Sequence, residues 1–290
     1  MRNPRLSFEF FPPKSERQRG RFWRTFGALE HLKPDFVSVT WGAQGADSAS
    51  SVALLEELVA ETSVPVVAHL TCAGLTRHDV QATLDRLRQL GISRLLALRG
   101  DDVSSHDAPG ALRHATDLLE IIAERGGFET SVSAYPEVHP EAHSAADDLK
   151  WLKRKAALGA RRAITQFFFE PVPFLRLRDA LASGEEGAAT GMTLVPGILP
   201  VHDIDGVVSF ADKCGSTVPT WLRERFLATD DPLARRQIAA DVATALCETL
   251  MREGVEDLHL YTLNRAELAA EVAQRLGAGS ARPERWSSAA

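Results

Sequence analysis

Short runs of β-branched or aromatic residues alternate with longer amphipathic segments along almost the whole sequence. The short runs are typical of strands, and the segments with apolar residues recurring every three or four positions are typical of helices. The predicted strands are Leu6–Phe11, Asp35–Thr40, Val64–Leu70, Arg94–Leu98, Glu129–Ala134, Ala163–Phe169, Thr193–Ile198 and Leu258–Thr262. The predicted helices include Val52–Thr62, Arg77–Leu90, Gly110–Arg125, Ala145–Leu158 and Pro232–Glu253. Such an alternation requires parallel strands joined by crossover helices, so it restricts the chain to α/β architectures.

Two α/β architectures compete, the closed (β/α)8 barrel and the doubly wound open sheet. About eight strand–helix units in 290 residues is the size of one TIM barrel. The first strand runs into Phe11-Pro12-Pro13-Lys14, without the G-x-G-x-x-G turn of a dinucleotide-binding sheet, and no G-x-x-x-x-G-K-[ST] phosphate loop is present. We therefore predict a single α/β barrel over residues 1–277 and a C-terminal tail over 278–290. Residues 200–231 should add helical pieces around Pro219 before the last strand, and Asp231-Pro232 should begin the helix that follows.

The charge balance excludes several classes of partner. Lys and Arg number 33 against 39 Asp and Glu, giving a formal net charge of −6, so no basic field favours nucleic acid or an anionic membrane.

The sequence has no signal-peptide segment and no apolar run of about 18 residues, and we expect a cytoplasmic protein. Three scattered cysteines suit neither a disulfide framework nor a CxxC metal site. His69, His139 and His143 lack the spacing of metal ligands, so no metal is expected.

An acidic residue lies within the apolar first strand. Alternation along the strand places Ser7, Glu9 and Phe11 on one face, which in a barrel is the lumen. Desolvation there favours the protonated carboxyl, as a general acid working near neutral pH requires. The structural alternative is an ion pair between Glu9 and an arginine.

Polar residues also occur where other predicted strands end. The strand ends read SVTWG at 38–42, AHLTC at 68–72, LRGD at 98–101, SAY at 133–135 and TQF at 165–167. Individually they have structural explanations, since His69 could be a hydrogen-bonded core residue and Thr40 or Gln166 could tie neighbouring strands. Together they favour a functional rim, because a barrel built for stability alone would carry Val, Ile and Leu there.

A basic segment follows the fifth predicted strand. Ser144 and Asp147 form a possible capping box at the start of a helix. Basic residues then gather at Lys150, Lys153, Arg154 and Lys155. This cluster is either a solvated helix face or a counter-charge for the pyrophosphate of a dinucleotide.

Taken together, these stretches resemble the bacterial methylenetetrahydrofolate reductases. The matching segments are SFEFFPPK at 7–14, FVSVTWGA at 36–43, HLTC at 69–72, LALRGD at 96–101, SAYPEVHPEA at 133–142, LKRKAALGARRAITQFFFE at 152–170, VPGILPV at 195–201 and LHLYTLNRAE at 258–267. They follow the family's order over nearly the whole chain. The resemblance implies a (β/α)8 barrel that holds FAD non-covalently. It also implies that NADH or NADPH reduces the flavin, which then reduces 5,10-methylenetetrahydrofolate to 5-methyltetrahydrofolate, in one-carbon metabolism and methionine biosynthesis.

The same resemblance implies roles for individual residues. Glu9 is similar to the general acid that protonates N10 of the folate, and Asp101 resembles the aspartate near the flavin and the pterin. Gln166 resembles a residue that hydrogen-bonds the pterin, and Phe210 an aromatic that stacks on folate or nicotinamide. Tyr261 and Arg265 are similar to residues on the substrate side. The positions similar to FAD contacts are Thr40, His69, Arg99, Gly100, Asp101, Tyr135, His139, Asp148, Arg154 and Lys155. A single open face would serve the nicotinamide and the folate in turn, as in a ping-pong mechanism.

Three features differ from the family pattern. Residues 43–48 lack the arginine of the usual turn, Trp151 stands where an asparagine often contacts FAD, and Gly206 replaces a glutamine near the substrate. One alternative is therefore direct hydride transfer from the nicotinamide to the folate without a flavin. Another is a barrel that binds folate or flavin without turnover. Family members are commonly oligomers, so a homo-oligomer is one option, while the oligomeric state and the choice between NADH and NADPH stay open.

Overall fold

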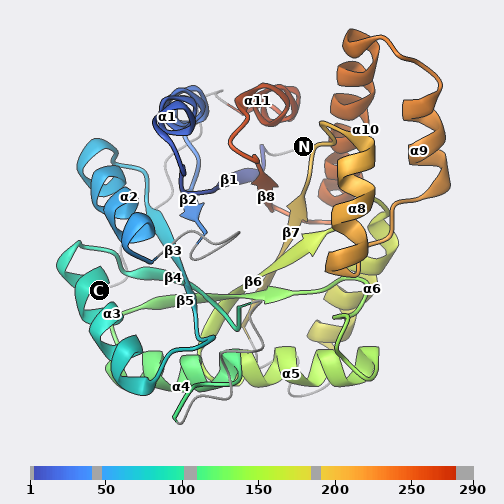
Figure 1. The fold of residues 1–290 in the computed structure, drawn as a ribbon. Coiled ribbons are helices and arrows are strands. Elements are labelled where there is room, and N and C mark those ends of the chain that lie inside the picture. Colours follow the sequence, from blue (N-terminus) through green and yellow to red (C-terminus); the bar gives the residue numbers. More distant parts are fainter. Residues whose placement is uncertain (1–2, 41–47, 101–109, 184–190, 279–290) are drawn as a thin grey trace.

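Parallel strands form a closed sheet at the centre of the protein, with helices around it (Figure 1). The computed structural model describes residues 3–40, 48–100, 110–183 and 191–278. Within these residues the strands close in sequence order from β1 to β8, and β1 pairs with both β2 and β8. All of these neighbours are parallel, which confirms the predicted (β/α)8 barrel.

The helices and strands lie close to the predicted positions. The strands are β1 (Arg5–Phe10), β2 (Phe36–Val39), β3 (Val66–Thr71), β4 (Arg94–Leu98), β5 (Glu129–Ala134), β6 (Ala160–Phe167), β7 (Thr193–Ile198) and β8 (Asp257–Tyr261). The helices are α1 (Glu16–Glu30), α2 (Ser48–Glu61), α3 (Arg77–Gln89), α4 (Ala115–Arg125), α5 (Ala145–Ala157), α6 (Pro171–Ala182), α8 (Ile204–Cys214), α9 (Thr220–Leu227), α10 (Pro232–Arg252) and α11 (Ala266–Arg275). The expected helical pieces on either side of Pro219 are α8 and α9, and Pro219 is the N-cap of α9.

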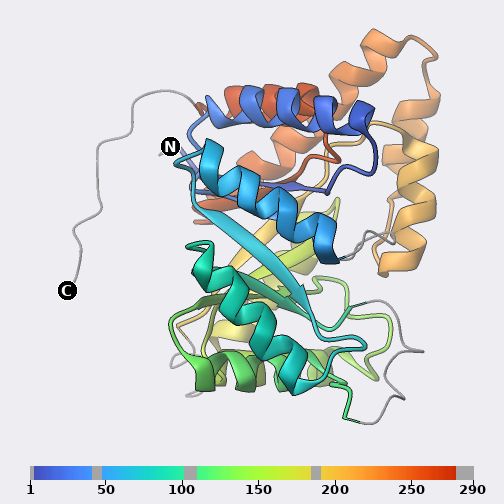
Figure 2. The ribbon, with the colours of Figure 1, turned by 60° about the vertical axis from the view of Figure 1, so that its left-hand side comes forward.

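The outer face of the barrel packs against the helices through large apolar side chains. Phe10 of β1 contacts Phe22 and Phe26 of α1, with ring centroids 5.4 and 5.7 Å apart. Phe22, Phe26 and Leu29 recur at helical spacing and are buried. Burying each such side chain contributes about 1.5–3 kcal/mol, so this face fixes α1 against β1. Figure 2 shows α1 lying beside α11, so the helix of the first strand–helix unit packs against the helix of the last.

The lumen is divided into an apolar layer and a polar layer. The apolar layer consists of Phe36, Val67, Leu96, Ile164 and Val195. Further along the strands, Glu9 is paired in register with Ser38 of β2 and Tyr261 of β8. The polar layer therefore lies toward the C-terminal strand ends, where barrel enzymes carry their active sites.

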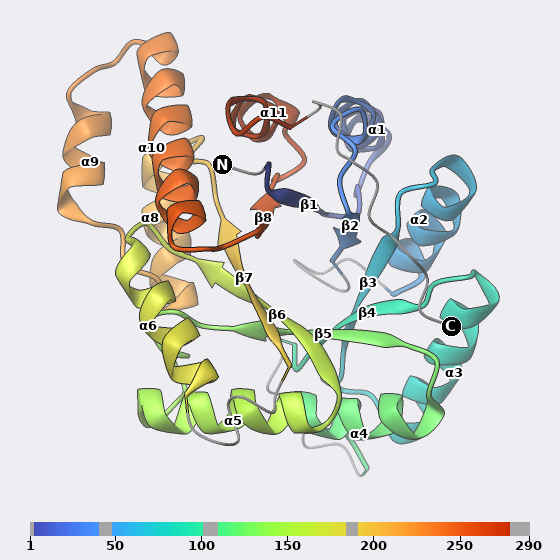
Figure 3. The same cartoon turned by 180° about the vertical axis from the view of Figure 1, so that it is seen from behind.

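The helices before the last strand form a separate apolar cluster. Figure 3 shows α9 beside α10 at one side of the barrel. Their buried residues include Leu222, Phe226 and Ala239, and Phe167 of β6 joins the same cluster. Asp231 begins α10 as predicted, because its carboxylate accepts hydrogen bonds from the backbone N–H groups of Leu233 and Ala234.

In the described part of the chain, no helix combines the length and apolar character needed to span a membrane.

Candidate active site

The carboxyl group of Glu9 lies inside the barrel, where the residue is 9% exposed. Its Oε2 atom is 3.6 Å from Nε2 of His69 on β3 and 3.7 Å from Nε2 of His259 on β8. Both distances exceed a normal hydrogen bond, so neither ring is bonded directly to the carboxyl. No arginine pairs with Glu9 in the ranges that the structure describes. The structural alternative considered from the sequence, a Glu–Arg ion pair, therefore has no support.

His259 is a member of this cluster that the sequence reasoning missed. Its Nδ1 lies 2.8 Å from Oγ of Ser7, and its ring stacks on Phe36 with centroids 5.8 Å apart. The edge of the ring also meets Tyr261 at 5.4 Å. The missed signal was the alternation in β8, which places His259 and Tyr261 on the lumen face just as it places Ser7 and Glu9 in β1.

Burial lowers the pKa of His69 to about 4, and the nearby Glu9 opposes that shift only in part. The imidazole of His69 is therefore neutral at pH 7. Burial, and to a lesser extent Glu9, raises the pKa of Tyr261 well above its usual value, so its hydroxyl keeps its proton. That hydroxyl donates a hydrogen bond of 2.7 Å to the carbonyl of Thr165. Glu9 thus has neutral neighbours in His69 and Tyr261.

Several buried polar atoms near Glu9 have no hydrogen-bond partner. Within the described residues these include Oγ of Ser38, Oγ1 of Thr40, and Nε2 of both His69 and His259. Leaving such a group unsatisfied costs about 1–3 kcal/mol. These atoms come from β2 and the residue that follows it, from β3 and from β8, the strands on either side of β1, so they surround Glu9 with groups that could bind a polar ligand.

A second group of candidate residues follows β4 and β5. The guanidinium of Arg99 forms two hydrogen bonds with Glu141, one of them with Nη2 2.8 Å from Oε1. The edge of the His139 ring meets the Tyr135 ring, with centroids 4.5 Å apart. The backbone N–H of His139 donates to Asp148 at 2.9 Å. The loop after β5 is thereby tied to the first turn of α5.

The basic residues of α5 do not converge on one point. The Lys155 ammonium turns toward β5 and donates to the carbonyl of Ser133 at 3.2 Å, and burial lowers the pKa of Lys155. Lys153 instead donates to the carbonyl of Ser183, and Arg154 pairs with Glu120 of α4 at 3.3 Å. Lys150 is exposed. The cluster seen in the sequence is therefore split around the helix, since a turn of 3.6 residues spreads consecutive side chains in all directions.

Gly100 allows a close approach of the backbone after β4. Its φ of +96° is unfavourable for other residues, and a Cβ atom there would lie 2.9 Å from Cβ of Ala73. Asp101, the next residue, lies outside the described residues, as does the segment 43–47. Trp151 of α5 is 52% exposed and stacks on His114.

The candidate residues for the substrate lie on β6, β8 and the helices before β8. Oε1 of Gln166 accepts a hydrogen bond from the backbone of Phe167. Phe210 is 44% exposed and stacks on Phe167 with centroids 5.4 Å apart. Gly206 lies one turn before Phe210 and is also exposed. Arg265 occupies the N-cap position of α11, where its side chain makes no capping hydrogen bond. No group of three or more His, Cys, Asp or Glu side chains in the described ranges is arranged to hold a metal ion.

Comparison with known protein families gives one match over most of the chain. The family described as methylenetetrahydrofolate reductase matches residues 1–277. The 5,10-methylenetetrahydrofolate reductase of Pectobacterium carotovorum is 40% identical over 275 residues, which cover 94% of this chain and 90% of that protein. The reductase of Escherichia coli K12 is 39% identical over 273 residues, with the same coverage of 94% and 90%.

Solved structures share the fold at low sequence identity. A protein from Clostridium thermocellum, described as binding two copies of 5-methyl-5,6,7,8-tetrahydrofolic acid, is similar with a TM-score of 0.67 and 13% identity. The matched parts cover 95% of this chain and 94% of that one. A tryptophan synthase α-subunit from Pyrococcus furiosus gives a TM-score of 0.54 at 13% identity, covering 96% and 100%. Likenesses at this identity indicate the barrel fold alone.

Proposed function

The chain belongs to the methylenetetrahydrofolate reductase family, and on that premise we propose that it uses NADH or NADPH and a bound FAD to reduce 5,10-methylenetetrahydrofolate to 5-methyltetrahydrofolate. The observation that carries the chemistry is the carboxyl of Glu9, held in the lumen by neutral neighbours. A binding protein would gain nothing from this placement. Residues 1–277 would form the catalytic domain.

The residues present fit a flavin dinucleotide. The unpartnered Ser38, Thr40 and His69 atoms offer buried donors and acceptors on β2 and β3, and the buried ammonium of Lys155 offers a positive charge beside the end of β5. Gly100 lets the backbone after β4 pack closely against Thr71 and Ala73. When bound, FAD would supply the hydride-transfer chemistry between the nicotinamide and the folate. We assign its binding to Thr40, His69, Arg99, Gly100, Asp101, Tyr135, His139, Asp148, Arg154 and Lys155.

Glu9 would protonate N10 of the folate as the methylene bridge opens. Its backbone is fixed by Thr262, whose Oγ1 donates to the carbonyl of Glu9 at 2.6 Å. His259 would act as a positioning residue, because Ser7 holds its Nδ1 and leaves Nε2 directed at the carboxyl. The lumen thus fixes the direction of the proton transfer.

The remaining candidate residues would orient the reactants. Gln166 lies near the end of β6, two residues after Ile164 of the apolar lumen layer, and its carboxamide would hydrogen-bond the pterin. The exposed ring of Phe210 offers a face for stacking, and its contact with Phe167 holds it in place. Asp101 would stabilise the cationic folate intermediate by its negative charge. Tyr261 and Arg265 would complete the substrate side.

The proposal is tested on the purified protein. We expect a yellow preparation that releases FAD when denatured and oxidises NAD(P)H with methylenetetrahydrofolate. Lys155→Met should weaken FAD retention, because it removes the buried ammonium. Lys150→Met is the matched control, since Lys150 is exposed on the same helix. A colourless preparation with full activity would instead establish direct hydride transfer from the nicotinamide. Absence of folate reduction in either form would overturn the proposal.

A further inference from the structure

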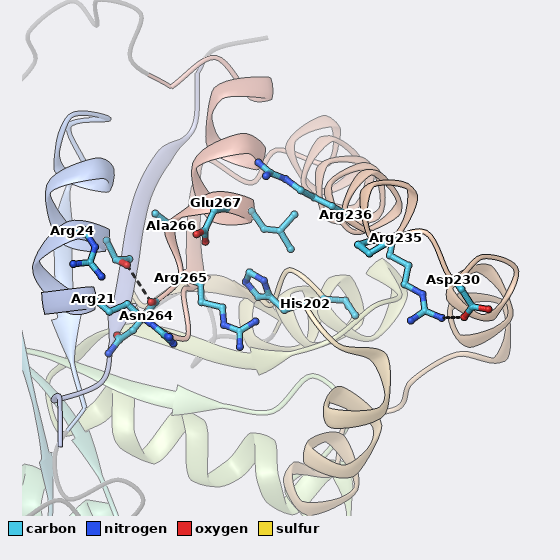
Figure 4. A pocket seen from close by; sticks show the side chains of 14 residues that line it. Arg21, Arg24, His202, Asp230, Arg235, Arg236, Asn264, Arg265, Ala266 and Glu267 are labelled. Carbon is cyan, nitrogen blue, oxygen red and sulfur yellow. Dashed lines mark hydrogen bonds and ion pairs between the residues drawn. The ribbon is translucent and has the colours of Figure 1, made fainter. Parts of the chain in front are cut away.

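The two ends of the barrel differ in the groups that lie there. Beside the C-terminal strand ends, a cavity of about 810 Å³ lies between α1, the start of α10 and the connections after β7 and β8 (Figure 4). Near the N-terminal strand ends, Glu129 of β5 pairs with Arg94 of β4 at 3.4 Å and with Arg162 of β6 at 3.1 Å. These charges therefore lie at the end of the barrel opposite to the candidate active site.

The apolar layer of the lumen separates this charged group from Glu9. Arg162 precedes Ile164 of that layer by two residues on β6. Glu9 is paired in register with Ser38, which follows Phe36 of the same layer by two residues on β2. Any effect of Arg162 on Glu9 must therefore pass through side chains of the apolar layer.

Arg162 contacts one of those side chains directly. Its guanidinium carbon, Cζ, lies 5.2 Å from the centre of the Phe36 ring. β2 and β6 are on opposite sides of the closed order of eight strands, so this contact crosses the lumen (Figure 1). A guanidinium within about 6 Å of an aromatic ring centre is attracted to the negative face of the ring. Because Phe36 is only 5% exposed, little water competes with this attraction.

The ring of Phe36 also stacks on His259. The two ring centroids are 5.8 Å apart and the ring planes differ by 20°. On the other atoms of the imidazole, Nδ1 lies 2.8 Å from Oγ of Ser7, and Nε2 lies 3.7 Å from Oε2 of Glu9. His259 is fully buried, so these neighbours determine the orientation of its ring. A continuous series of contacts thus leads from Arg162 through Phe36 and His259 to the carboxyl of Glu9.

Arg94 provides an internal comparison for Arg162. Both arginines pair with Glu129, and their side chains are similarly exposed, at 28% for Arg94 and 25% for Arg162. Among the described residues, however, only Arg162 forms a cation–π contact with Phe36. The ion pair with Glu129 and the contact with Phe36 can therefore be separated by experiment.

We propose that Arg162 is a positioning residue for protonation of the folate, and that it acts on Glu9 through Phe36 and His259. The inference rests on the proposed function and adds to it a residue at the far end of the lumen. The guanidinium holds the Phe36 ring, the ring limits the tilt of His259, and Nε2 of His259 keeps its place beside the carboxyl. Without the guanidinium, Glu9 and His259 remain but are less well oriented for the proton transfer.

The test is a double-mutant cycle measured on the rate of folate reduction. Arg162→Met should lower this rate by about 2- to 30-fold, the range that corresponds to the loss of one cation–π contact. Arg162→Lys keeps a cation and should recover part of the loss. Phe36→Leu should lower the rate by itself, and combining it with Arg162→Met should add little, because the ring that transmits the effect is then absent.

Two controls separate positioning from a general structural effect. Arg94→Met removes an ion pair of Glu129 without touching Phe36, and it should leave the rate of folate reduction within about twofold. Reduction of the flavin by NAD(P)H needs no proton from Glu9, so its rate in Arg162→Met should stay within about threefold of the wild-type rate.

The outcomes distinguish this inference from the proposed function. Additive losses in the cycle, equal slowing of both half-reactions, or an equal effect of Arg94→Met would show that Arg162 only maintains the barrel and would overturn the inference. If Phe36→Leu does not fold, the comparison of Arg162→Met with Arg162→Lys and Arg94→Met still decides. The cycle reports folate reduction, so it applies equally if the hydride passes directly from the nicotinamide. Wild-type protein that reduces no folate would refute the reductase function itself.

Discussion

Replacing Glu9 by glutamine tests the general acid without changing the shape of the lumen. The amide would occupy the position of the carboxyl, 3.6 Å from His69 and 3.7 Å from His259, where its N–H groups face two unpartnered ring nitrogens. The substitution creates no cavity, and His69 is neutral at pH 7, so no strong ion pair with it is lost. We therefore expect the free energy of unfolding to change by less than about 1 kcal/mol.

The effect on catalysis should be confined to the half-reaction that needs the proton. General acid catalysis contributes about 10²- to 10⁴-fold, so folate reduction should slow by this factor, equivalent to about 3–5 kcal/mol in the barrier. Reduction of the flavin by NAD(P)H needs no proton from Glu9 and should keep its rate within about threefold.

Stopped-flow absorbance measures the two half-reactions separately. Flavin bleaching after mixing with NAD(P)H reports the first, and recovery of the flavin colour after mixing with methylenetetrahydrofolate reports the second. Glu61→Gln, at the exposed end of α2, provides a control that removes one carboxylate far from the lumen. Equal slowing of both half-reactions, or a large loss of stability, would show that Glu9 maintains the structure and would refute its assignment as the acid.

Three further predictions concern stability. Tyr261→Phe should destabilise the barrel by about 1–3 kcal/mol in urea titrations, because the carbonyl of Thr165 loses the 2.7 Å hydrogen bond that it accepts at the register shift between β6 and β7. Asp231→Ala should cost about 0.5–2 kcal/mol in the same assay, because the first turn of α10 loses its cap. The folded-state pKa values of His69 and His202 are lowered to about 4 from 6.5, so the unfolded chain binds more protons between these values. The free energy of unfolding should therefore fall as pH decreases from 6.5 to 4, and His202→Gln should reduce that fall by the order of 1–3 kcal/mol. An unchanged slope in the variant would contradict the buried neutral state of His202.

Local patterns predicted much of the fold because they reflect local geometry. The period of the apolar residues distinguishes helices from strands, and the alternation in β1 correctly placed Glu9 in the lumen. The N-cap at Asp231 was also predictable, since capping depends on a few adjacent residues. The same local reasoning was incomplete for α5, where a dense run of basic residues suggested one cluster although Lys153 and Lys155 point to different elements.

The sequence by itself determined the succession of strands and helices, the parallel pairing that this succession requires, and the face of β1 that carries a carboxyl. The number of units and the missing G-x-G-x-x-G turn favoured the closed barrel over an open sheet. The tertiary structure decided which side chains meet. It brings His259 of β8 to Glu9 of β1 because the last strand closes on the first. It also places Arg21 of α1 and Arg265 before α11 around one cavity because those helices lie side by side. Such contacts join residues from opposite ends of the chain, so the periodicity of a short segment does not predict them.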